Sequence, residues 1–187
     1  MRTFIAIELT KEIKDALGEL ESQLKSSGAD VKWVKPENIH ITLKFLGEIE
    51  PGKAEEIKPV LVDVAGSFIP FKMRLSSLGA FPKIDYPRVI WVGIDEGKDA
   101  LVKIAKDLED RLAKMGFSGE QRAFAAHITI GRLRSSANRH RLVELMQKYL
   151  DPLNMECPVD KLTLYKSTLS LSGPIYEVIS EVRLSKD

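Results

Sequence analysis

One tetrapeptide pattern occurs twice in this chain, and it limits the local structure at both places. The first copy reads His40-Ile41-Thr42-Leu43 and the second reads His127-Ile128-Thr129-Ile130. Each copy alternates polar and apolar residues, which is the period of a half-buried β-strand. Each therefore predicts a strand that directs one imidazole and one hydroxyl, about 7 Å apart, toward the same face. Two of the chain's three histidines lie in these copies, so the repetition indicates one site with two related halves.

Hydrophobic periodicity around the two copies predicts alternating strands and helices. Besides the two histidine strands, which begin at residues 40 and 127, strands are predicted over residues 3–9, 31–34, 71–78, 88–94, 161–169 and 175–184. Helices are predicted between Thr10 and Gly28, from Pro51 onward, and over 101–115 and 137–150. Within the second helix we expect a kink or a break at Pro59, because proline lacks the N–H that a helix interior uses. The residues between the strands 71–78 and 88–94 are rich in turn formers.

Each half of the chain carries a strand, a helix, a histidine strand and a further helix, which indicates a weak internal duplication. Several strands follow one another without a helix between them, and no glycine-rich phosphate loop follows a strand. We therefore expect an α+β fold with antiparallel sheets rather than a parallel α/β sheet. At 187 residues with 44% hydrophobic content, the chain suits one domain, residues 1–187, with a substantial core.

The overall charge is nearly balanced, with 28 basic and 27 acidic residues, so it does not indicate a class of partner. The single cysteine, Cys157, excludes an internal disulfide and fits a reducing compartment. The sequence shows neither a signal peptide at its N-terminus nor an apolar run of membrane length. We therefore expect a cytoplasmic protein that has no contact with membranes, and we expect a monomer.

A metal site and a nucleophile–histidine site are two kinds of chemistry that a histidine pair could serve. Zinc sites need three or four ligands at short spacings, and here there is no His-Glu-x-x-His and no cysteine pair. Cys157 has no histidine near it in sequence and suits a small core position, and no Gly-x-Ser-x-Gly elbow is present. We therefore expect neither a metal nor a cofactor.

A general acid–base pair accounts directly for the duplication. Displacement at phosphorus needs one group to accept a proton from the attacking oxygen and another to protonate the leaving oxygen, on opposite sides of the phosphorus. Two imidazoles that titrate near neutral pH suit these tasks. The hydroxyls of Thr42 and Thr129 could donate hydrogen bonds to the oxygens on which charge accumulates. The alternative, two ordinary strand histidines beside a β-favouring threonine, would be preferred for one copy but not for two.

These motifs and their flanking residues resemble the 2H phosphoesterase superfamily, and within it the RNA 2′,3′-cyclic phosphodiesterases, also called 2′-5′ RNA ligases. The resemblance rests on Arg2-Thr3-Phe4-Ile5-Ala6-Ile7, His40-Ile41-Thr42-Leu43-Lys44-Phe45-Leu46-Gly47, Gly79-Ala80-Phe81-Pro82, Pro87-Arg88-Val89-Ile90-Trp91-Val92-Gly93 and His127-Ile128-Thr129-Ile130-Gly131-Arg132. It implies a bilobal, pseudo-two-fold fold, in which antiparallel sheets flank a central cleft and helices lie outside.

The resemblance also implies metal-independent opening of a terminal RNA 2′,3′-cyclic phosphate to a 2′-phosphate. By the family's assignment, His40 is the proton donor and His127 the proton acceptor. The residues alone leave these roles open, because the two motifs are nearly identical. Two rival functions also stay open: 2′-5′ ligation by the same site, and binding of RNA ends without catalysis.

The charge distribution supports a phosphate-bearing partner, RNA with a 2′,3′-cyclic phosphate end. Between Glu120 and Glu144 there is no acidic residue, yet five arginines lie there: Arg122, Arg132, Arg134, Arg139 and Arg141. This segment brackets the second motif and predicts a cationic rim. Strict alternation would bury Arg132, which is costly. Either a strand end or bulge at Gly131 turns it toward the phosphate, which we favour, or it reaches an acidic partner.

Three more residues are predicted to bind substrate. Lys44 shares the face of His40 and Thr42 if the alternation continues, although a solvated lysine at the far end of the strand is an equal alternative. Trp91 has the opposite parity to its apolar neighbours in the strand, so it could face the site and stack on a base, unless it belongs to the core. Arg88 lies in the same resembling segment.

Overall fold

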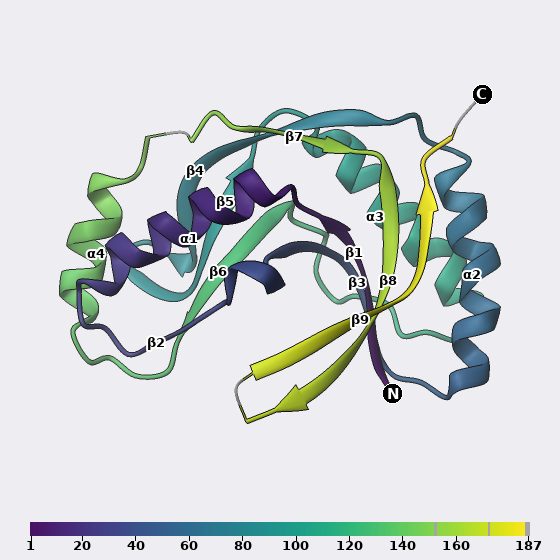
Figure 1. The fold of residues 1–187 in the computed structure, drawn as a ribbon, viewed down its shortest axis with the longest axis horizontal. Helices are drawn as coiled ribbons and strands as arrows, with labels where there is room; N and C mark the ends of the chain where they lie inside the picture. The colour runs from purple at the N-terminus through teal and green to yellow at the C-terminus, as the bar shows by residue number, and fades with distance from the viewer. Residues whose placement is uncertain (152, 172, 186–187) are drawn as a thin grey trace.

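The computed structural model describes residues 1–151, 153–171 and 173–185, which form two lobes, each built on one sheet (Figure 1). The first sheet has the strand order β3-β1-β8-β9, with the bounds His40–Glu48, Arg2–Glu8, Lys161–Ser170 and Gly173–Arg183. The second has the order β2-β6-β5-β4-β7, with the bounds Val31–Trp33, His127–Leu133, Tyr86–Ile94, Phe71–Lys83 and Glu156–Val159. Every described pair of neighbouring strands is antiparallel, which confirms the predicted α+β class.

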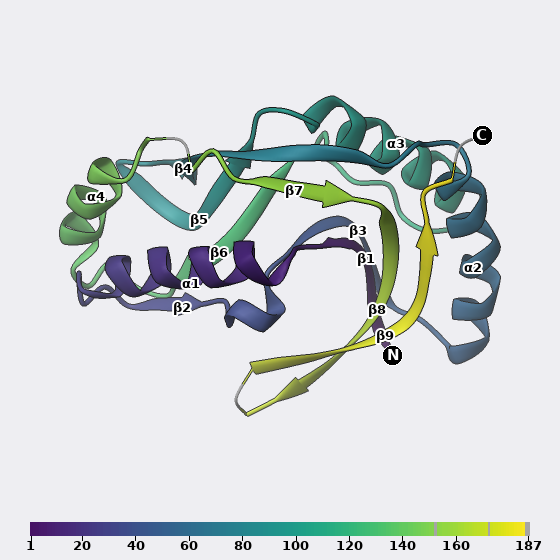
Figure 2. The same cartoon turned by 45° about the horizontal axis from the view of Figure 1, so that its top comes forward.

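The helices exchange lobes between the two halves of the chain. The structure describes four α-helices and one short 3₁₀ helix: α1 (Lys11–Lys25), α2 (Pro51–Ala65), α3 (Lys98–Ala113), α4 (Arg139–Lys148) and η1 (Pro36–Asn38). Helix α1 follows a strand of the first sheet, yet it lies beside α4 on the lobe of the second sheet (Figure 2). Helix α3 follows a strand of the second sheet, yet it packs beside α2 against β3 of the first. This exchange links the lobes.

Local sequence explains where these helices begin and what holds them. The hydroxyl of Thr10 accepts a hydrogen bond from the N–H of Ile13 at 3.5 Å, which caps α1 as predicted. Helix α2 runs without a break through Pro59, so the expected break is wrong. Pro59 is exposed, and the helix is held by its buried side, which comprises Ala54, Ile57, Leu61, Val64 and Ala65.

The sequence prediction missed two features of the second sheet. The stretch predicted as a turn-rich connection is mostly strand, because β4 continues to Lys83 and β5 already begins at Tyr86. Gly79 lies in β4, and the indole of Trp91 occupies the space where a side chain at residue 79 would stand. The short strand β7 pairs with the start of β4 and was not predicted.

Burial of the apolar residues orients both histidine strands. Ile41 and Ile128, which follow the two histidines, are 0% exposed and belong to the hydrophobic core. Complete burial of such a side chain stabilises the fold by about 1.5–3 kcal/mol. Because successive strand residues point to opposite faces, His40 and His127 must face away from this core. We call that side of each sheet its histidine face. None of the helices in the described part of the chain is long and apolar enough to cross a membrane.

One carboxyl group on α1 is buried without a hydrogen-bond partner among the described residues. Glu21 has 0% exposure, neither of its carboxylate oxygens is hydrogen-bonded, and Lys25 Nζ lies 3.6 Å from Oε2. Burial raises the pKa of Glu21 to about 7, and Lys25 only partly opposes this. Because the unfolded chain ionises this group at lower pH, the fold loses stability as the pH rises from about 4.5 to about 7.

Replacing this carboxyl by an amide should therefore remove a pH-dependent penalty. We expect the stability of Glu21→Gln relative to wild type to increase by roughly 2–3 kcal/mol between pH 5 and pH 8. Urea unfolding at the two pH values measures this difference. The exposed Glu19 on the same helix supplies the control, Glu19→Gln, for which the difference should stay near zero. A pH-independent effect of Glu21→Gln would show that Glu21 titrates normally.

Candidate active site

The two motif histidines occupy equivalent positions and make equivalent hydrogen bonds. Each is the first residue of its strand, His40 in β3 and His127 in β6. The Nδ1 of His40 donates to the carbonyl of Asn38 at 2.7 Å, and the Nδ1 of His127 donates to the carbonyl of Ala125 at 2.6 Å. A carbonyl can only accept, so both neutral rings carry their hydrogen on Nδ1. Both Nε2 atoms therefore carry no hydrogen and can act as bases, and that of His40 accepts a hydrogen bond from the hydroxyl of Thr42 at 2.9 Å.

A β-bulge follows each motif at the same position. Leu43 of β3 has no opposing residue in β1, and Ile130 of β6 has none in β5. Both bulged residues lie three positions after the histidine, and both are buried. A bulge adds one residue to a strand and so reverses the alternation beyond it. The side chains after the bulge therefore point to the opposite faces from those that simple alternation predicts.

This reversal makes the expected position of Lys44 wrong. Its side chain points away from the histidine face and is 3% exposed. The Nζ atom forms an ion pair with Glu109 at 2.8 Å, donates to the carbonyl of Ser118 at 2.8 Å and lies 3.4 Å from Glu120. Lys44 thus connects β3 to α3 and to the loop after it, instead of facing the site.

The corresponding bulge in β6 turns Arg132 outward, as predicted. The unpaired residue is Ile130, one position before the bulge that we expected at Gly131. Arg132 is exposed and forms no ion pair within the described residues, so the alternative of an acidic partner is not supported. It lies close enough to His127 that its charge lowers the pKa of that imidazole. In the first motif the equivalent outward position is occupied by Phe45, which is 56% exposed.

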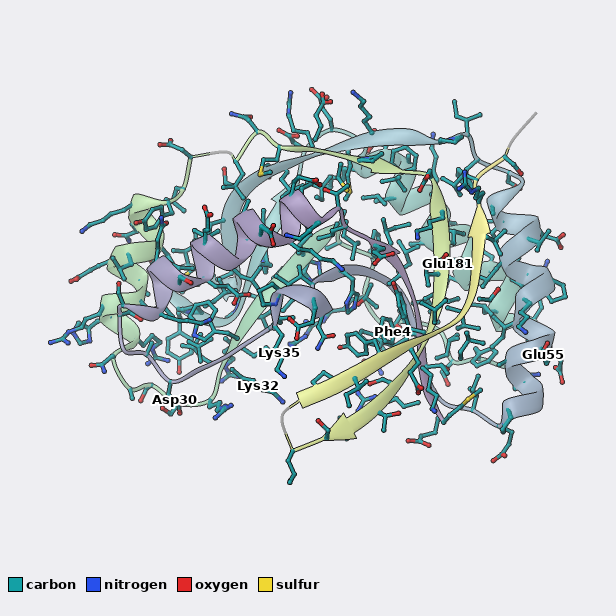
Figure 3. The ribbon with its side chains drawn as sticks, in the orientation of Figure 1. Phe4, Asp30, Lys32, Lys35, Glu55 and Glu181 are labelled. Carbon is teal, nitrogen blue, oxygen red and sulfur yellow. The ribbon has the colours of Figure 1, made fainter. Side chains whose placement is uncertain are left out.

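Aromatic rings and a threonine hold His40. Its ring stacks on Phe4 at a centroid distance of 4.8 Å and meets the edge of Tyr176 at 5.4 Å. Its Nε2 lies 2.9 Å from the hydroxyl of Thr42. Phe4 lies where the hairpin formed by β8 and β9 crosses β1 (Figure 3). The sequence did not predict Tyr176 at the site, because the residue pattern of the last strand shows neither which face Tyr176 lies on nor which residues it contacts.

A different pair of rings surrounds His127. Phe81 meets it edge-on at 5.1 Å and Trp91 at 6.2 Å, and the two rings contact each other at 5.2 Å. Trp91 is paired with Thr129 across the strands, so it lies on the histidine face as predicted from its parity. Both of its glycine neighbours on β4 and β5, Gly79 and Gly93, leave room for the indole.

Arg88 lies at an irregularity of β5. It is exposed and has no opposing residue in β4, because its two neighbours in β5 pair with Phe81 and Pro82. Its side chain interacts with the phenol of Tyr86, over whose ring the guanidinium of Arg139 lies at 3.9 Å. Both arginines lower the pKa of Tyr86, and Arg139 has the larger effect. The role of Arg88 in substrate binding stays a prediction.

Burial sets the protonation state of both histidines. Burial lowers the pKa of His40, the hydrogen bond to Asn38 partly opposes this, and the charge of Lys14 lowers it further. Burial likewise lowers the pKa of His127, with opposition from Ala125 and a further decrease from Arg132. Both imidazoles are therefore neutral at neutral pH, and an anion bound between them would favour protonation of one.

The strands that carry the two motifs contact each other where the sheets meet. The neighbouring strands thus carry two imidazoles of the same tautomer, two threonine hydroxyls and the guanidinium of Arg132, which forms no ion pair among the described residues. Such a set can accept a proton at one position, donate one at another and hold an anion. Cys157 is buried, and the described residues contain no group of three or more His, Cys, Asp or Glu side chains that could hold a metal ion.

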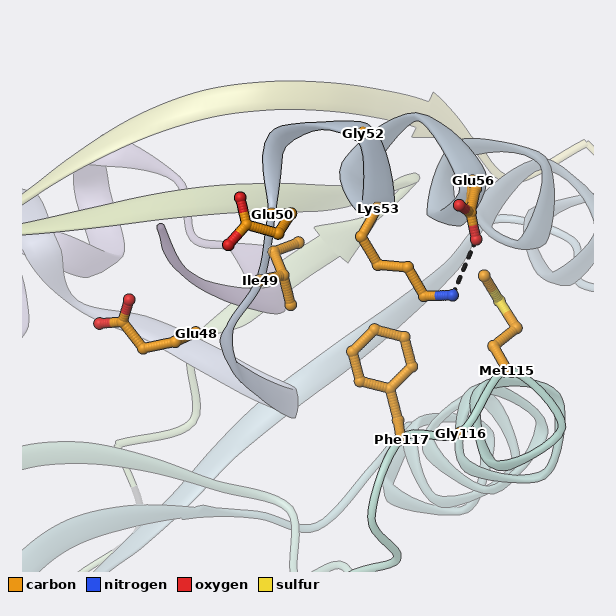
Figure 4. Close-up of a pocket in the computed structure, with 9 residues that line it drawn as sticks. All are labelled: Glu48, Ile49, Glu50, Gly52, Lys53, Glu56, Met115, Gly116 and Phe117. Carbon is orange, nitrogen blue, oxygen red and sulfur yellow. Dashed lines mark hydrogen bonds and ion pairs between the residues drawn. The ribbon is translucent and has the colours of Figure 1, made fainter.

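A separate groove of about 450 Å³ lies between the start of α2 and the end of α3 (Figure 4). In it Lys53 forms an ion pair with Glu56 at 2.7 Å and lies above the ring of Phe117. None of the residues predicted from the sequence to belong to the site lines this groove. The groove is therefore distinct from the histidine pair.

Comparisons with known proteins agree with this geometry. The family described as LigT-like phosphoesterase matches residues 7–91 and again residues 92–176, so each match contains one motif. An RNA 2′,3′-cyclic phosphodiesterase of Methanocaldococcus jannaschii is 40% identical over 97% of this chain and 99% of its own. The crystal structure of TT0787 of Thermus thermophilus has a TM-score of 0.83 at 26% identity, and 100% of both chains is covered. Escherichia coli LigT complexed with 3′-AMP has a TM-score of 0.78 at 25% identity, covering 99% and 98%.

The close approach of Trp91 to Gly79 can be tested directly. A methyl group at residue 79 would overlap the indole, so Gly79→Ala should push Trp91 off the strand and loosen its contacts with Phe81 and His127. We expect a loss of about 1–3 kcal/mol of stability and stronger quenching of tryptophan fluorescence by acrylamide. Gly52→Ala is the matched control, because its methyl group would enter open space. Unchanged quenching in Gly79→Ala would mean that the strand accommodates the added methyl group without moving the indole.

Proposed function

This chain belongs to the LigT-like phosphoesterase family, and we propose that it opens the 2′,3′-cyclic phosphate at an RNA end to a 2′-phosphate. The observation that carries the proposal is the pair of imidazoles with the same tautomer, each placed by a bulged strand. The similar protein of Methanocaldococcus jannaschii bears the name of this activity. The proposal includes independence from metals, since two imidazoles suffice for both proton transfers.

In the proposed mechanism the two histidines act on opposite sides of the phosphorus. The Nε2 of His127 takes a proton from a water molecule, and the oxygen of that water attacks the phosphorus in line with the 3′ oxygen. The bond from phosphorus to the 3′ oxygen breaks, and the Nε2–H of His40 protonates that oxygen. The product is a 2′-phosphate and a free 3′-hydroxyl. The assignment of donor and acceptor follows the family resemblance, and the common tautomer is compatible with it.

Three further groups hold the reacting phosphate. Thr42 and Thr129 lie on the histidine faces and donate to the non-bridging oxygens, whose charge increases in the transition state. Protonation of the Nε2 of His40 releases the hydroxyl hydrogen of Thr42 for this role. The guanidinium of Arg132 forms no ion pair among the described residues and adds a positive charge on the same side as His127. The negative charge of the bound phosphate raises the pKa of the nearby imidazole, which supplies the protonated acid that the free enzyme lacks. Trp91, next to His127, offers a ring for the base.

Substitution of either histidine, combined with product analysis, tests this function. His40→Ala and His127→Ala should each lower the turnover of a short RNA ending in a 2′,3′-cyclic phosphate by roughly 10²–10⁴-fold. Wild-type protein in excess chelator should give only the 2′-phosphate isomer, because the facing histidines fix the axis of attack. His140→Ala, a change at an exposed helix residue, should retain full activity.

Each other outcome of this experiment has a definite meaning. An untouched cyclic end would reject the enzymatic function, and a 3′-phosphate product would reverse the substrate's orientation. Activity lost in chelator and restored by a divalent ion would reject independence from metals. A 5′-hydroxyl RNA added to the reaction would reveal 2′-5′ ligation as a joined product.

The lowered pKa values of both histidines predict an acidic optimum for the free enzyme. The active form carries one proton on the pair, so kcat/KM should follow a bell-shaped curve with its maximum below pH 6.5. Because Arg132 lowers the pKa of His127, Arg132→Gln should shift one limb of this curve to higher pH. Arg134→Gln removes an equal charge from an exposed position and should leave the curve in place. An optimum above pH 7 would contradict the assignment of both limbs to these imidazoles.

A further inference from the structure

Three polar residues form a row across the histidine face of the first sheet, outside the histidine pair. Arg2 of β1 lies opposite Ser167 of β8, and Ser167 lies opposite Tyr176 of β9. Directly opposed residues share a face. Phe4, two residues after Arg2, stacks on His40 and contacts Tyr176 at 4.9 Å, so this face is the one that carries His40.

The position of Tyr176 is fixed relative to His40. Its ring meets the imidazole edge-on at 5.4 Å. Asn38, whose carbonyl accepts the Nδ1–H of His40 at 2.7 Å, also donates from its side chain to the carbonyl of Pro174 at 2.9 Å. The same residue thus positions the imidazole and the segment of β9 that precedes Tyr176. Asn38 therefore ties the position of Tyr176 to that of His40.

Arg2 is available to bind an anion. Its side chain is exposed, and it forms no ion pair within the described part of the chain. The carboxylate opposite it, that of Glu48, is 84% exposed and lies 3.7 Å from the N-terminal amine. Burial raises the pKa of Tyr176, and the charges of Arg2 and, less strongly, Arg132 oppose that rise, so the phenol stays protonated and both guanidiniums lie near it.

Arg2, at one end of the row, is displaced along β1 from the position that pairs with His40. His40 is paired with Glu8, at the other end of this strand from Arg2. At about 3.3 Å per residue, the backbone positions of Glu8 and Arg2 are roughly 20 Å apart. Tyr176 lies between these positions, because its ring contacts both His40 and Phe4, and Phe4 is two residues from Arg2. Arg2 and Ser167 therefore lie farther from His40 than Tyr176 does, where the next group of a bound chain would lie.

We propose that Arg2, Ser167 and Tyr176 form a second phosphate subsite, which binds the phosphodiester on the 5′ side of the terminal nucleotide of an RNA substrate. This inference rests on the proposed function, which places the terminal phosphate between the histidines. A guanidinium and two hydroxyls supply only hydrogen-bond donation and positive charge to such a group. The subsite makes no contact with the reacting atoms, so it favours chains of at least two nucleotides over mononucleotides.

Paired substrates that differ only in this phosphodiester test the subsite. Adenosine 2′,3′-cyclic phosphate lacks it, and the diadenosine with a 2′,3′-cyclic phosphate end has it. For Arg2→Gln and Ser167→Ala we expect KM for the dinucleotide to rise about tenfold, with kcat and the mononucleotide constants unchanged. The control is Lys166→Gln, which removes a charge from the opposite face of β8, where Lys166 pairs with Glu177 at 2.8 Å.

Salt dependence supplies a second readout that a merely structural role would not change. The plot of log KM against log salt for the dinucleotide should lose a slope of about 0.7 in Arg2→Gln, the value for one single-strand phosphate contact. An equal loss with both substrates, or no loss with either, would overturn the subsite.

Binding of the reaction products separates this inference from the proposed function. Calorimetry with the diadenosine 2′-phosphate and with adenosine 2′-phosphate needs no turnover. If wild type cleaves neither cyclic substrate, the proposed function fails, while the calorimetry still decides the subsite. A dinucleotide affinity that Arg2→Gln lowers supports the subsite, and an affinity that it leaves unchanged rejects it.

Discussion

Each histidine strand contains one unpaired residue at the end of its motif, and the site depends on this mismatch with the neighbouring strand. The extra residues, Leu43 and Ile130, are buried, so the strand must reverse its alternation after them. In β3 the reversal sends Lys44 into a buried ion pair with α3, and in β6 it exposes Arg132 beside His127. The same kind of bulge thus buries Lys44 of the first motif in an ion pair and leaves Arg132 of the second without an ion pair among the described residues.

The two histidines are also held in the same way. A backbone carbonyl two residues earlier fixes each ring in one tautomer, and burial keeps each ring neutral until an anion arrives. In this arrangement the proposed substrate itself supplies the charge that makes one imidazole an acid. Under the proposed function, the product phosphate no longer carries the strain of the ring. Arg132 and the two threonines would still bind it.

The two halves of the site differ in what surrounds the histidines. His40 is packed among the rings of Phe4 and Tyr176, on a sheet whose strands β8 and β9 extend as a hairpin beyond the lobe (Figure 1). His127 is flanked by Phe81 and Trp91 on a lobe that also carries the arginine-rich segment. The proposed substrate is asymmetric. A fully symmetric site could not select one direction of attack on its cyclic phosphate.

The sequence by itself determined the two motifs, the strands that carry them, the helices and the outward direction of His40, Thr42, His127, Thr129 and Trp91. These follow from short-range alternation and helical spacing, which act within one segment. Only the tertiary structure decided the positions of Lys44, Arg88 and Tyr176 and the row that begins at Arg2. A bulge depends on the length and register of the neighbouring strand, and that strand lies far away in the sequence. Periodicity along one segment therefore cannot reveal where it must skip a residue, or which distant residue stands beside it.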